Sequence, residues 1–274
     1  MSDTDSILQT VELTKHFGNV VAVEGVDFSL REGEIMALVG DNGAGKSTFI
    51  KMLCGVHEPT SGEIRIDGEP IEFEDYSDAR EMGIETVYQD LALAEQQTVA
   101  ANVFLGQEPV RSDLLGRLLG VVDKQAMRDR ARESLDRVQI PVDPDARVSD
   151  LSGGQQQAVA VARALQSDPD ILILDEPTSA LSIEGARNVL RVIDDLRNEG
   201  LSIILISHNI RQVLTLADRV SVLAQGRLMG VRDTDSATRD EIIALMMGAE
   251  DEDEIDEFEL TSVDDSADEE GAAA

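Results

Sequence analysis

The sequence predicts an α/β domain built on buried parallel strands, and three observations support this fold class. Short apolar runs at residues 35–39, 171–174 and 203–206 alternate with longer amphipathic stretches, which is the pattern of strands covered by helices. The first of these runs leads directly into a glycine-rich turn. No internal repeat interrupts the alternation, so we expect one such domain in the chain.

The elements can be placed in order along the chain. The uninterrupted apolar run at residues 35–39 predicts a buried strand, and we expect the helix after the glycine-rich turn at residues 47–54. Residues 63–68 alternate in polarity and end in an Asp-Gly dipeptide, which indicates one half of a β-hairpin.

The middle of the chain, residues 92–138, is helical in texture. Asp123 is a suitable N-cap for a helix that continues to Arg137, because its carboxylate can accept a backbone N–H of the first turn. Further helices are expected at residues 156–165 and 239–247. The apolar face of the helix after Asp123 is expected to consist of Val122, Ala126, Met127 and Leu135.

Composition restricts the class of protein. The 274 residues are 42% hydrophobic, which is enough for a sizeable core, but no apolar run approaches the roughly 20 residues that cross a bilayer. The first five residues are polar and acidic, unlike a signal peptide. The single cysteine, Cys54, excludes an internal disulfide and fits a reducing compartment. We therefore expect a soluble, intracellular protein.

The chain is strongly acidic, with 55 Asp and Glu against 23 Lys and Arg and a net charge of −32. Residues 250–274 hold 13 of the acids and no Lys or Arg, and only four residues of the whole chain are lysines. The negative charges of such a chain repel one another in dilute buffer. At ~1 M salt the Debye length is about 3 Å and this repulsion is screened, so we expect a halophilic archaeal protein. Residues 250–274 are expected to form a disordered acidic tail. Nucleic-acid binding is not expected, because no basic surface is available for phosphates.

A phosphate-binding motif follows the first apolar run. Residues 40–48 read Gly-Asp-Asn-Gly-Ala-Gly-Lys-Ser-Thr, which fits the pattern G-x-x-x-x-G-K-[ST]. The glycines let backbone N–H groups converge on phosphate oxygens, and the following helix adds the positive end of its dipole. Lys46 can reach the β- and γ-phosphates, and the Ser47 hydroxyl can ligate Mg²⁺. The expected nucleotide-binding residues of this loop are Gly40, Asn42, Gly43, Gly45, Lys46, Ser47 and Thr48.

A second candidate site follows the apolar run at residues 171–174, where Asp175 and Glu176 are adjacent. Because the carboxyl ends of parallel strands meet at one edge of a sheet, we expect both carboxylates near the phosphate-binding loop. Asp175 is suited to hold Mg²⁺ through water, and Glu176 is suited to polarise an attacking water as general base. Together the two motifs predict ATP hydrolysis.

A third motif, Leu-Ser-Gly-Gly-Gln at residues 151–155, provides another glycine-rich helix N-terminus suited to phosphate. One of the two phosphate sites can therefore act in its own chain while the other serves a partner's nucleotide. With this motif, residues 7–248 resemble the ATP-binding cassette (ABC) family of P-loop NTPases. The resemblance implies a cassette at residues 1–249, made of a RecA-like α/β core, an antiparallel β subdomain and a helical subdomain at about residues 91–150.

The resemblance assigns further roles one position at a time. It places Phe17 where the family stacks an aromatic ring on adenine, and Gln89 where a glutamine contacts Mg²⁺ and couples the site to the membrane partner. It places His208 where a histidine contacts the γ-phosphate. It implies that the partner's nucleotide is contacted by Ser152, Gly153, Gly154 and Gln155. The implied catalytic residues are then Lys46, Glu176 and His208, and the implied Mg²⁺ ligands are Ser47, Gln89 and Asp175.

Ser182 departs from the family pattern. Many family members carry Asp at this position, in a loop that crosses the dimer interface, whereas a serine hydroxyl can hydrogen-bond but carries no charge. We therefore expect an altered contact between the two cassettes.

By the same resemblance, two cassettes close head to tail over two ATP molecules beneath transmembrane permease subunits, as a homodimer or with a sister cassette. The stretches at residues 83–93 and 102–106 are similar to single-cassette ATPases of ribose, xylose and fructose importers. This implies monosaccharide import at the cytoplasmic face of the membrane, with a sugar-binding protein in the same system. Two alternatives stay open: another class of ABC transporter, and a soluble cassette that serves iron–sulfur cluster assembly.

Overall fold

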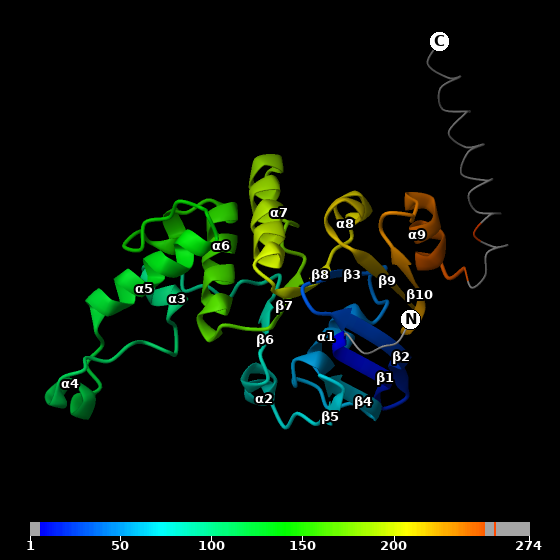
Figure 1. Ribbon diagram of the computed structural model, residues 1–274, viewed down its shortest axis with the longest axis horizontal. Helices are drawn as coiled ribbons and strands as arrows, with labels where there is room; N and C mark the ends of the chain where they lie inside the picture. Colours follow the sequence, from blue (N-terminus) through cyan, green and yellow to red (C-terminus); the bar gives the residue numbers. More distant parts are fainter. Residues whose placement is uncertain (1–5, 250–254, 256–274) are drawn as a thin grey trace, which may run out of the picture. The chain divides into compact units, whose positions relative to one another are not determined.

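The computed structural model describes residues 6–249 and residue 255 (Figure 1). The chain divides into two compact units, one formed by Met1–Met82 with Ser202–Ala274 and the other by Gly83–Leu201. We refer to them as the first and the second unit. The predictions for residues 1–5 and for the acidic tail lie outside the described residues, apart from Ile255.

An antiparallel sheet in the first unit is built from the N-terminal part of the chain. Its order is β2 (Val20–Arg31), β1 (Ser6–Phe17), β4 (Ser61–Ile66) and β5 (Glu69–Ile71). The expected hairpin is confirmed, because Asp67 and Gly68 join β4 to β5 with φ angles of 51° and 82°. Positive φ at both central residues matches the right-handed twist of the flanking strands. The antiparallel sheet implied by the family resemblance is therefore present.

Parallel strands of the first unit carry the phosphate-binding loop. Strand β3 (Ile35–Val39) lies between β8 (Ser202–Ile206) and β9 (Arg219–Ala224), parallel to both, and β10 (Arg227–Asp233) pairs antiparallel with β9. Every residue of β3 and β8 is buried, as expected for strands covered on both faces. Helices α8 (Ile210–Leu216) and α9 (Arg239–Met246) lie side by side on one face of these strands (Figure 1).

Polar groups secure the start of β3. The carboxylate of Glu34, only 5% exposed, forms an ion pair with Arg219 at 3.1 Å and also accepts the backbone N–H of Arg31. Asp218 accepts the backbone N–H of Ile35 at 2.8 Å. Breaking one partner of so buried a pair leaves an uncompensated charge, so these contacts hold β3 and β9 in one register.

Two further helices of the first unit follow strand ends. Helix α1 (Lys46–Leu53) begins one residue before the expected position, and Cys54, fully buried and not in a disulfide, lies at its C-terminal end. Helix α2 (Tyr76–Glu81) is capped by Asp75, whose carboxylate accepts the backbone N–H of Ser77 at 2.7 Å. Hydrogen bonds from Ser77 hold the pKa of Asp75 below its ordinary value of 3.8.

The second unit combines one parallel strand pair with a group of helices. Strand β6 (Ile84–Val87) pairs in parallel with β7 (Ile171–Asp175), so the strand expected after residue 170 is confirmed. The helices are α3 (Val99–Val103), α4 (Leu114–Leu119), α5 (Lys124–Arg137), α6 (Gly153–Ala164) and α7 (Ile183–Asn198), with short 3₁₀ turns at Val148–Asp150 and Leu165–Ser167.

Two expectations about these helices need correction. Asp123 caps α5 as expected, but Val122 is 36% exposed and forms a β-bridge with Val110, because it precedes the cap and is not on the helix. The buried face of α5 is instead formed by Met127, Ala131, Ser134 and Leu135. Helix α6 begins at Gly153, three residues before the expected start, because Ser152 caps it.

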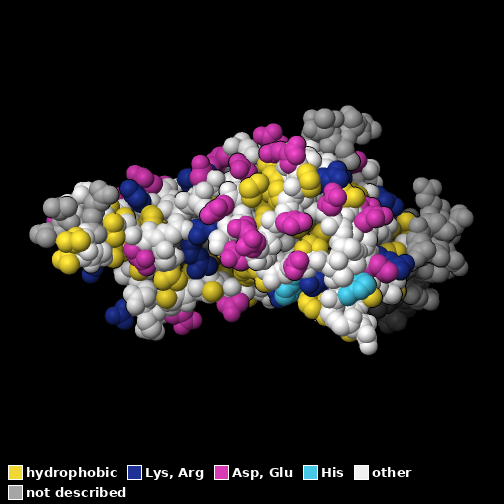
Figure 2. Space-filling view, turned by 90° about the horizontal axis from the view of Figure 1, so that it is seen from below, with side chains coloured by type: hydrophobic (Ala, Val, Ile, Leu, Met, Phe, Trp, Pro, Cys, Tyr) yellow, Lys and Arg dark blue, Asp and Glu magenta, His cyan; other side chains and the backbone are white. Residues whose placement is uncertain are grey.

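Acidic side chains are scattered over the face shown in Figure 2 and do not gather into one cluster. Few Lys and Arg lie between them, in keeping with the net charge of −32. Within residues 6–249 and at residue 255, no helix combines the length and the apolarity needed to cross a bilayer.

Candidate functional site

The phosphate-binding loop connects β3 to α1, and tight backbone packing imposes its shape. A Cβ on Gly40 would run into the carbonyl oxygen of Leu223. Gly45 has a φ of 104°, and a Cβ there would lie 2.6 Å from the carbonyl oxygen of Ala22. Only glycine meets both requirements without moving the neighbouring backbone. The loop is therefore a preformed cradle.

The turn between β9 and β10 is hydrogen-bonded to the phosphate-binding loop and to β2. The backbone N–H of Gly226 donates to the carbonyl oxygen of Ala44 at 3.0 Å, and the carbonyl oxygen of Gly226 accepts the N–H of Glu24 at 2.8 Å. The loop, the β9–β10 turn and β2 are thus connected through backbone hydrogen bonds, and Arg227 after the turn adds an ion pair with Glu24 of β2 at 2.7 Å. Residues 41–43, by contrast, are exposed, so their backbone N–H groups can be reached by a ligand.

Helix α1 begins without a capping side chain. Its N-cap, Gly45, makes no side-chain hydrogen bond to the first turn, so the positive end of the helix stays open to an anion. The Lys46 ammonium group lies across the loop and donates to the carbonyl oxygens of Gly40, at 2.5 Å, and Asp41, at 3.1 Å. Ser47 is exposed and Thr48 is half-buried. These groups have the chemistry that binds a phosphate chain.

Phe17 stands at the end of β1 with 44% of its surface exposed. Its ring meets the His57 ring edge to face at 5.3 Å, and the Lys15 ammonium group lies 5.3 Å from its centroid. His57 therefore supports Phe17, a role that no local pattern in the sequence indicated. One ring held in place and left partly exposed is suited to stack on a planar base.

His208 follows β8 directly and is exposed. The next residue, Asn209, caps α8 by accepting the backbone N–H of Gln212 at 3.3 Å, and its own N–H donates to the Ser207 hydroxyl at 3.1 Å. These bonds give the segment that carries His208 a defined backbone path. Phe17, the phosphate-binding loop and His208 all belong to the first unit.

Asp175 and Glu176 lie at the end of β7 in the second unit, both half-buried. Glu176 has a φ of 51°, the left-handed region that costs a non-glycine residue on the order of 1 kcal/mol or more. The backbone N–H of Ser179 donates to the Glu176 carbonyl oxygen at 3.2 Å and closes the turn. The chain thus holds the backbone of Glu176 in an unfavourable conformation at the end of β7.

Gln89 follows β6 and is exposed, and two clamps hold the loop after it. The Arg163 guanidinium group of α6 donates to the carbonyl oxygens of Leu91, at 2.7 Å, and Ala92, at 3.2 Å. The fully buried side chain of Asn102 accepts the N–H of Ala94 and donates to its carbonyl oxygen. The sequence offered one signal for Asn102, a carboxamide within an apolar helix, and none for Arg163.

One pocket of the second unit, about 400 Å³ in volume, brings several expected residues together. Gln89, Gly153 and Glu176 all line it, together with residues of the loops that follow β6 and β7. Gln89 and Glu176 were expected to act on the same nucleotide, and Gly153 on a partner's. Their shared pocket is lined by the start of α6 and by six residues with amide or carboxylate side chains: Gln89, Asp90, Glu95, Gln156, Gln157 and Glu176.

The Leu-Ser-Gly-Gly-Gln motif forms a closed capping arrangement at the start of α6. The Ser152 hydroxyl accepts the backbone N–H of Gln155 at 3.4 Å, while the Gln155 side chain accepts the N–H of Ser152 at 2.9 Å. A Cβ on Gly153 would lie 2.9 Å from the Leu181 side chain, and one on Gly154 would lie 3.4 Å from Gly185 of α7. The motif therefore has a structural role in capping α6 and packing it against α7.

Ser182 also has a structural role. Its hydroxyl accepts the backbone N–H of Gly185 at 3.1 Å and so caps α7. Asp and Ser are about equally good N-caps, so the departure from the family pattern leaves this helix capped. The expected effect of Ser182 on a dimer contact stays a prediction.

The expected metal ligands divide between the units. Ser47 belongs to the first unit, and Gln89 and Asp175 belong to the second. Among the described residues, no group of three or more His, Cys, Asp and Glu side chains is placed to hold a metal ion. One carboxylate and one hydroxyl nevertheless fit Mg²⁺, which commonly takes one or two protein ligands beside water and substrate phosphates.

Comparisons with known proteins agree on one family. A family model described as ABC transporter matches residues 23–179. A ribose import ATP-binding protein of Rubrobacter xylanophilus is 46% identical over 242 residues, 88% of this chain and 47% of that protein. A fructose import ATP-binding protein of Rhizobium meliloti is 42% identical over 247 residues, 89% of this chain and 95% of that protein.

A solved structure shares the fold as well as part of the sequence. It is a dimeric ATP-binding cassette in a post-hydrolysis state, bound to ADP and phosphate, with 27% identity and a TM-score of 0.69 over 83% of this chain and 98% of that chain. This chain spans about half the length of the ribose protein and of several other curated relatives that it matches, and nearly the whole length of the fructose protein.

Proposed function

Because this chain belongs to the ABC transporter family, we propose that it is the ATP-binding and ATP-hydrolysing subunit of a monosaccharide importer. The cradle formed by Gly40, Gly45 and Lys46 at the open N-terminus of α1 is the observation that carries the proposal. It requires glycine at two positions for reasons of space, and it offers backbone donors, an ammonium group and a helix dipole to one anion.

In this proposal the first unit binds the nucleotide. The exposed N–H groups of residues 41–43 and of the first turn of α1 donate to phosphate oxygens, and Lys46 exchanges its bonds to loop carbonyls for charge-assisted bonds to phosphate. Phe17, supported by His57, stacks on the adenine ring. His208 contacts the γ-phosphate.

Hydrolysis is assigned to the end of β7. Glu176 accepts a proton from the attacking water as that water approaches the γ-phosphate. The turn closed by the N–H of Ser179 holds its backbone in the left-handed region. Ser47, Gln89 and Asp175 would hold Mg²⁺, which when bound supplies positive charge to the β- and γ-phosphate oxygens. Exposure of Gln89 and the clamps on the loop behind it suit a residue that senses the nucleotide and reports to a partner.

The second nucleotide contact is proposed to come from another cassette. Ser152, Gly153, Gly154 and Gln155 would face the partner's γ-phosphate, so that ATP favours a closed pair by contacting both chains. The solved dimeric cassette bound to ADP and phosphate supports this arrangement. The simplest pair is a homodimer.

Substrate class and location rest on relatives. The proteins with 46% and 42% identity are named for ribose and fructose import, and the second has nearly the same length as this chain. We infer that this chain works at the cytoplasmic face of the membrane, bound to permease subunits that receive sugar from a binding protein. The acidity and scarcity of lysine further support a halophilic source, in which the protein works in molar salt.

Hydrolysis is tested with purified protein in molar KCl with Mg²⁺, by phosphate release from ATP. Glu176→Gln keeps the shape of the side chain and removes the base, so the rate is expected to fall by about 100-fold or more. A control, Glu199→Gln, alters an exposed glutamate of the second unit and should leave the rate unchanged. Equal rates for Glu176→Gln and wild type would rule out the assigned base.

Sugar import is tested in the native cell by uptake of labelled ribose, xylose and fructose. Replacement of the chromosomal copy by the Glu176→Gln form should abolish uptake of at least one sugar and leave amino-acid uptake intact. If hydrolysis by the purified protein depends on Glu176 while uptake of every sugar is unchanged, the ATPase assignment stands and the sugar assignment fails.

A further inference from the structure

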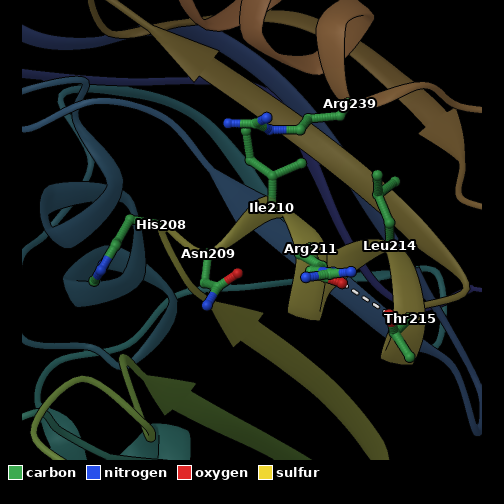
Figure 3. A pocket seen from close by; sticks show the side chains of 7 residues that line it. All are labelled: His208, Asn209, Ile210, Arg211, Leu214, Thr215 and Arg239. Atoms are coloured by element: carbon green, nitrogen blue, oxygen red, sulfur yellow. Dashed lines mark hydrogen bonds between the residues drawn. The ribbon is translucent and has the colours of Figure 1, made fainter. Parts of the chain in front are cut away.

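A second pocket, in the first unit, is not used by the proposed chemistry apart from one residue at its edge. It has a volume of about 730 Å³ and is lined by the segment from His208 to Arg211, by Leu214 and Thr215 of α8, and by Arg239 at the start of α9. Figure 3 shows these side chains, with Arg239 reaching from α9 towards Ile210. The hydroxyl of Thr215 donates to the Arg211 carbonyl oxygen at 2.8 Å, so this hydroxyl is engaged within α8.

The pocket combines an apolar wall with two cations. Ile210 is 9% exposed and Leu214 is half-buried, whereas Arg211 and Arg239 are exposed. Neither arginine forms an ion pair with any residue in 6–249, although at least nine other arginines of that range do. Glu241, in the first turn of α9, is engaged with Arg232. What the pocket adds is position, because it places two such exposed cations beside one apolar wall.

The acidic segment that follows α9 has the complementary chemistry. Residues 250–259 contain eight acids, with Ile255 and Phe258 between them and no Lys or Arg. Ile255, the one described residue beyond Ala249, is only 7% exposed but is not among the residues that line the pocket, so the apolar contact is assigned to Phe258. Carboxylates can pair with the two guanidinium groups while an apolar side chain contacts Ile210 and Leu214.

Chain length permits this contact within one molecule. Helix α9 has eight residues, so its two ends are about 12 Å apart at 1.5 Å per residue. Four extended residues span roughly 13 Å, so the acids from residue 251 onward can lie back along α9 and reach Arg239. The same unit holds the pocket and the chain after Ser202.

We propose that residues 250–259 bind in cis to the Arg211–Arg239 pocket. His208 lines the same pocket, so the bound segment lies beside the residue assigned to the γ-phosphate and lowers the rate of hydrolysis. Docking itself is independent of the proposed function, whereas this regulatory consequence rests on it.

Docking is tested in the full-length protein by placing the photo-cross-linker benzoylphenylalanine at Phe258. After irradiation, cross-links identified by mass spectrometry should map within one chain to residues 210–215 and 239. The double variant Arg211→Gln with Arg239→Gln should lose most of this product. A matched control, Arg187→Gln with Arg191→Gln, removes two exposed, unpaired arginines from α7 and should retain it.

Each other outcome overturns the proposal. Cross-links elsewhere, equal yields in the two double variants, or products joining two chains would exclude docking in cis at this pocket. The charge dependence adds a second check, because yield should fall as KCl is raised from 0.5 M to about 3 M, and a yield that rises with salt would contradict a role for the arginines.

The regulatory consequence is tested separately by ATPase rate. Replacing Glu252, Glu254, Glu257 and Glu259 by Gln should raise the rate at least about twofold, as expected if half or more of the molecules hold the segment docked. Cross-linking at the pocket with no change of rate would overturn the regulation and leave the docking. Failure of the proposed function would instead show as hydrolysis that does not depend on Glu176.

Discussion

The N-termini of α1 and α6 are both glycine-rich and both suited by sequence to phosphate, yet they are built differently. Helix α1 starts at Gly45 without a capping side chain, so the N–H groups of its first turn are open to a ligand. Helix α6 starts inside a capping box in which Ser152 and Gln155 satisfy each other. The backbone N–H groups at the start of α1 can accept an anion as their partner. At the start of α6, the side chains of Ser152 and Gln155 already act as partners for two of the backbone N–H groups.

This difference matches the two roles assigned to the sites. A site that binds nucleotide within its own chain benefits from donors that have no other partner. A site that meets nucleotide only when a second cassette arrives must remain ordered in the separated state, and a capping box supplies that order. Substitutions at the N-termini of α1 and α6 test whether the two sites have these different roles.

The largest effect is expected at α1. Lys46→Ala removes a charge-assisted donor worth about 1.5–3 kcal/mol, so ATP affinity should fall by about 10- to 150-fold. Equilibrium binding of a fluorescent ATP analogue measures this directly, and thermal unfolding without nucleotide should change little. Lys51→Ala, on the last turn of the same helix, is the control and should bind normally. Unchanged affinity in Lys46→Ala would place the nucleotide elsewhere.

A smaller and different effect is expected at α6. Ser152→Ala should lower the free energy of unfolding by about 1 kcal/mol through loss of the cap, with ATP binding by the single chain unchanged. Ser152→Asp restores a capping carboxylate but places a negative charge where the partner's phosphate is expected. Stability should therefore recover in the Asp variant while ATP-dependent dimerisation on a sizing column does not. If stability and ATP-dependent dimerisation both recover in the Asp variant, the motif acts only as a helix cap.

Ser182 offers the same test at the start of α7. Ser182→Ala should cost about 1 kcal/mol in urea unfolding. The free energy of unfolding of Ser182→Asp should equal that of wild type or exceed it by up to about 1 kcal/mol. The reason is that a carboxylate stabilises a helix N-terminus by about 0.3–1 kcal/mol. If Ser182→Asp changes the cooperativity of ATP hydrolysis at unchanged stability, the change arises at the contact between cassettes. A loss of stability in the Asp variant would contradict the capping role.

The smallest effect is a pH dependence at the start of α2, where the cap is a carboxylate. Because the folded protein lowers the pKa of Asp75 from 3.8, ionised Asp75 stabilises the fold above that pH, and the contribution disappears as pH falls through the folded pKa. Asp75→Asn keeps a neutral cap at every pH. Wild type should therefore be slightly more stable at pH 7, and the difference should vanish once the pH falls below the folded pKa of Asp75, as measured by urea unfolding in constant KCl.

Much of the fold could be predicted because its signals are local. Apolar runs of four or five residues identified β3, β7 and β8, and the Asp-Gly dipeptide identified the β4–β5 hairpin. The phosphate-binding loop was also visible, since its glycines are required by backbone shape. These features depend on neighbours in sequence or on a repeating period, and both can be read without a structure.

Two kinds of feature could not be predicted from the sequence. Some depend on contacts between residues that are far apart along the chain, and others involve a residue that has both a structural and an expected functional role. Arg163 and Asn102 hold the loop after Gln89 through bonds to carbonyl groups far along the chain or on a neighbouring turn. Ser152 and Ser182 were interpreted through an expected ligand and an expected dimer, although the serine-to-glutamine spacing at α6 is also a capping-box pattern. Val122 was placed on a helix face that begins after it.

The buried thiol of Cys54 can report local unfolding of the region around the phosphate-binding loop. It is fully buried at the end of the helix that follows the phosphate-binding loop, and it is the only thiol in the sequence. A thiol reagent can reach it only when that region opens, so the labelling rate measures the frequency of local unfolding. Protection that grows with added ATP would record occupancy of the loop without any enzymatic readout.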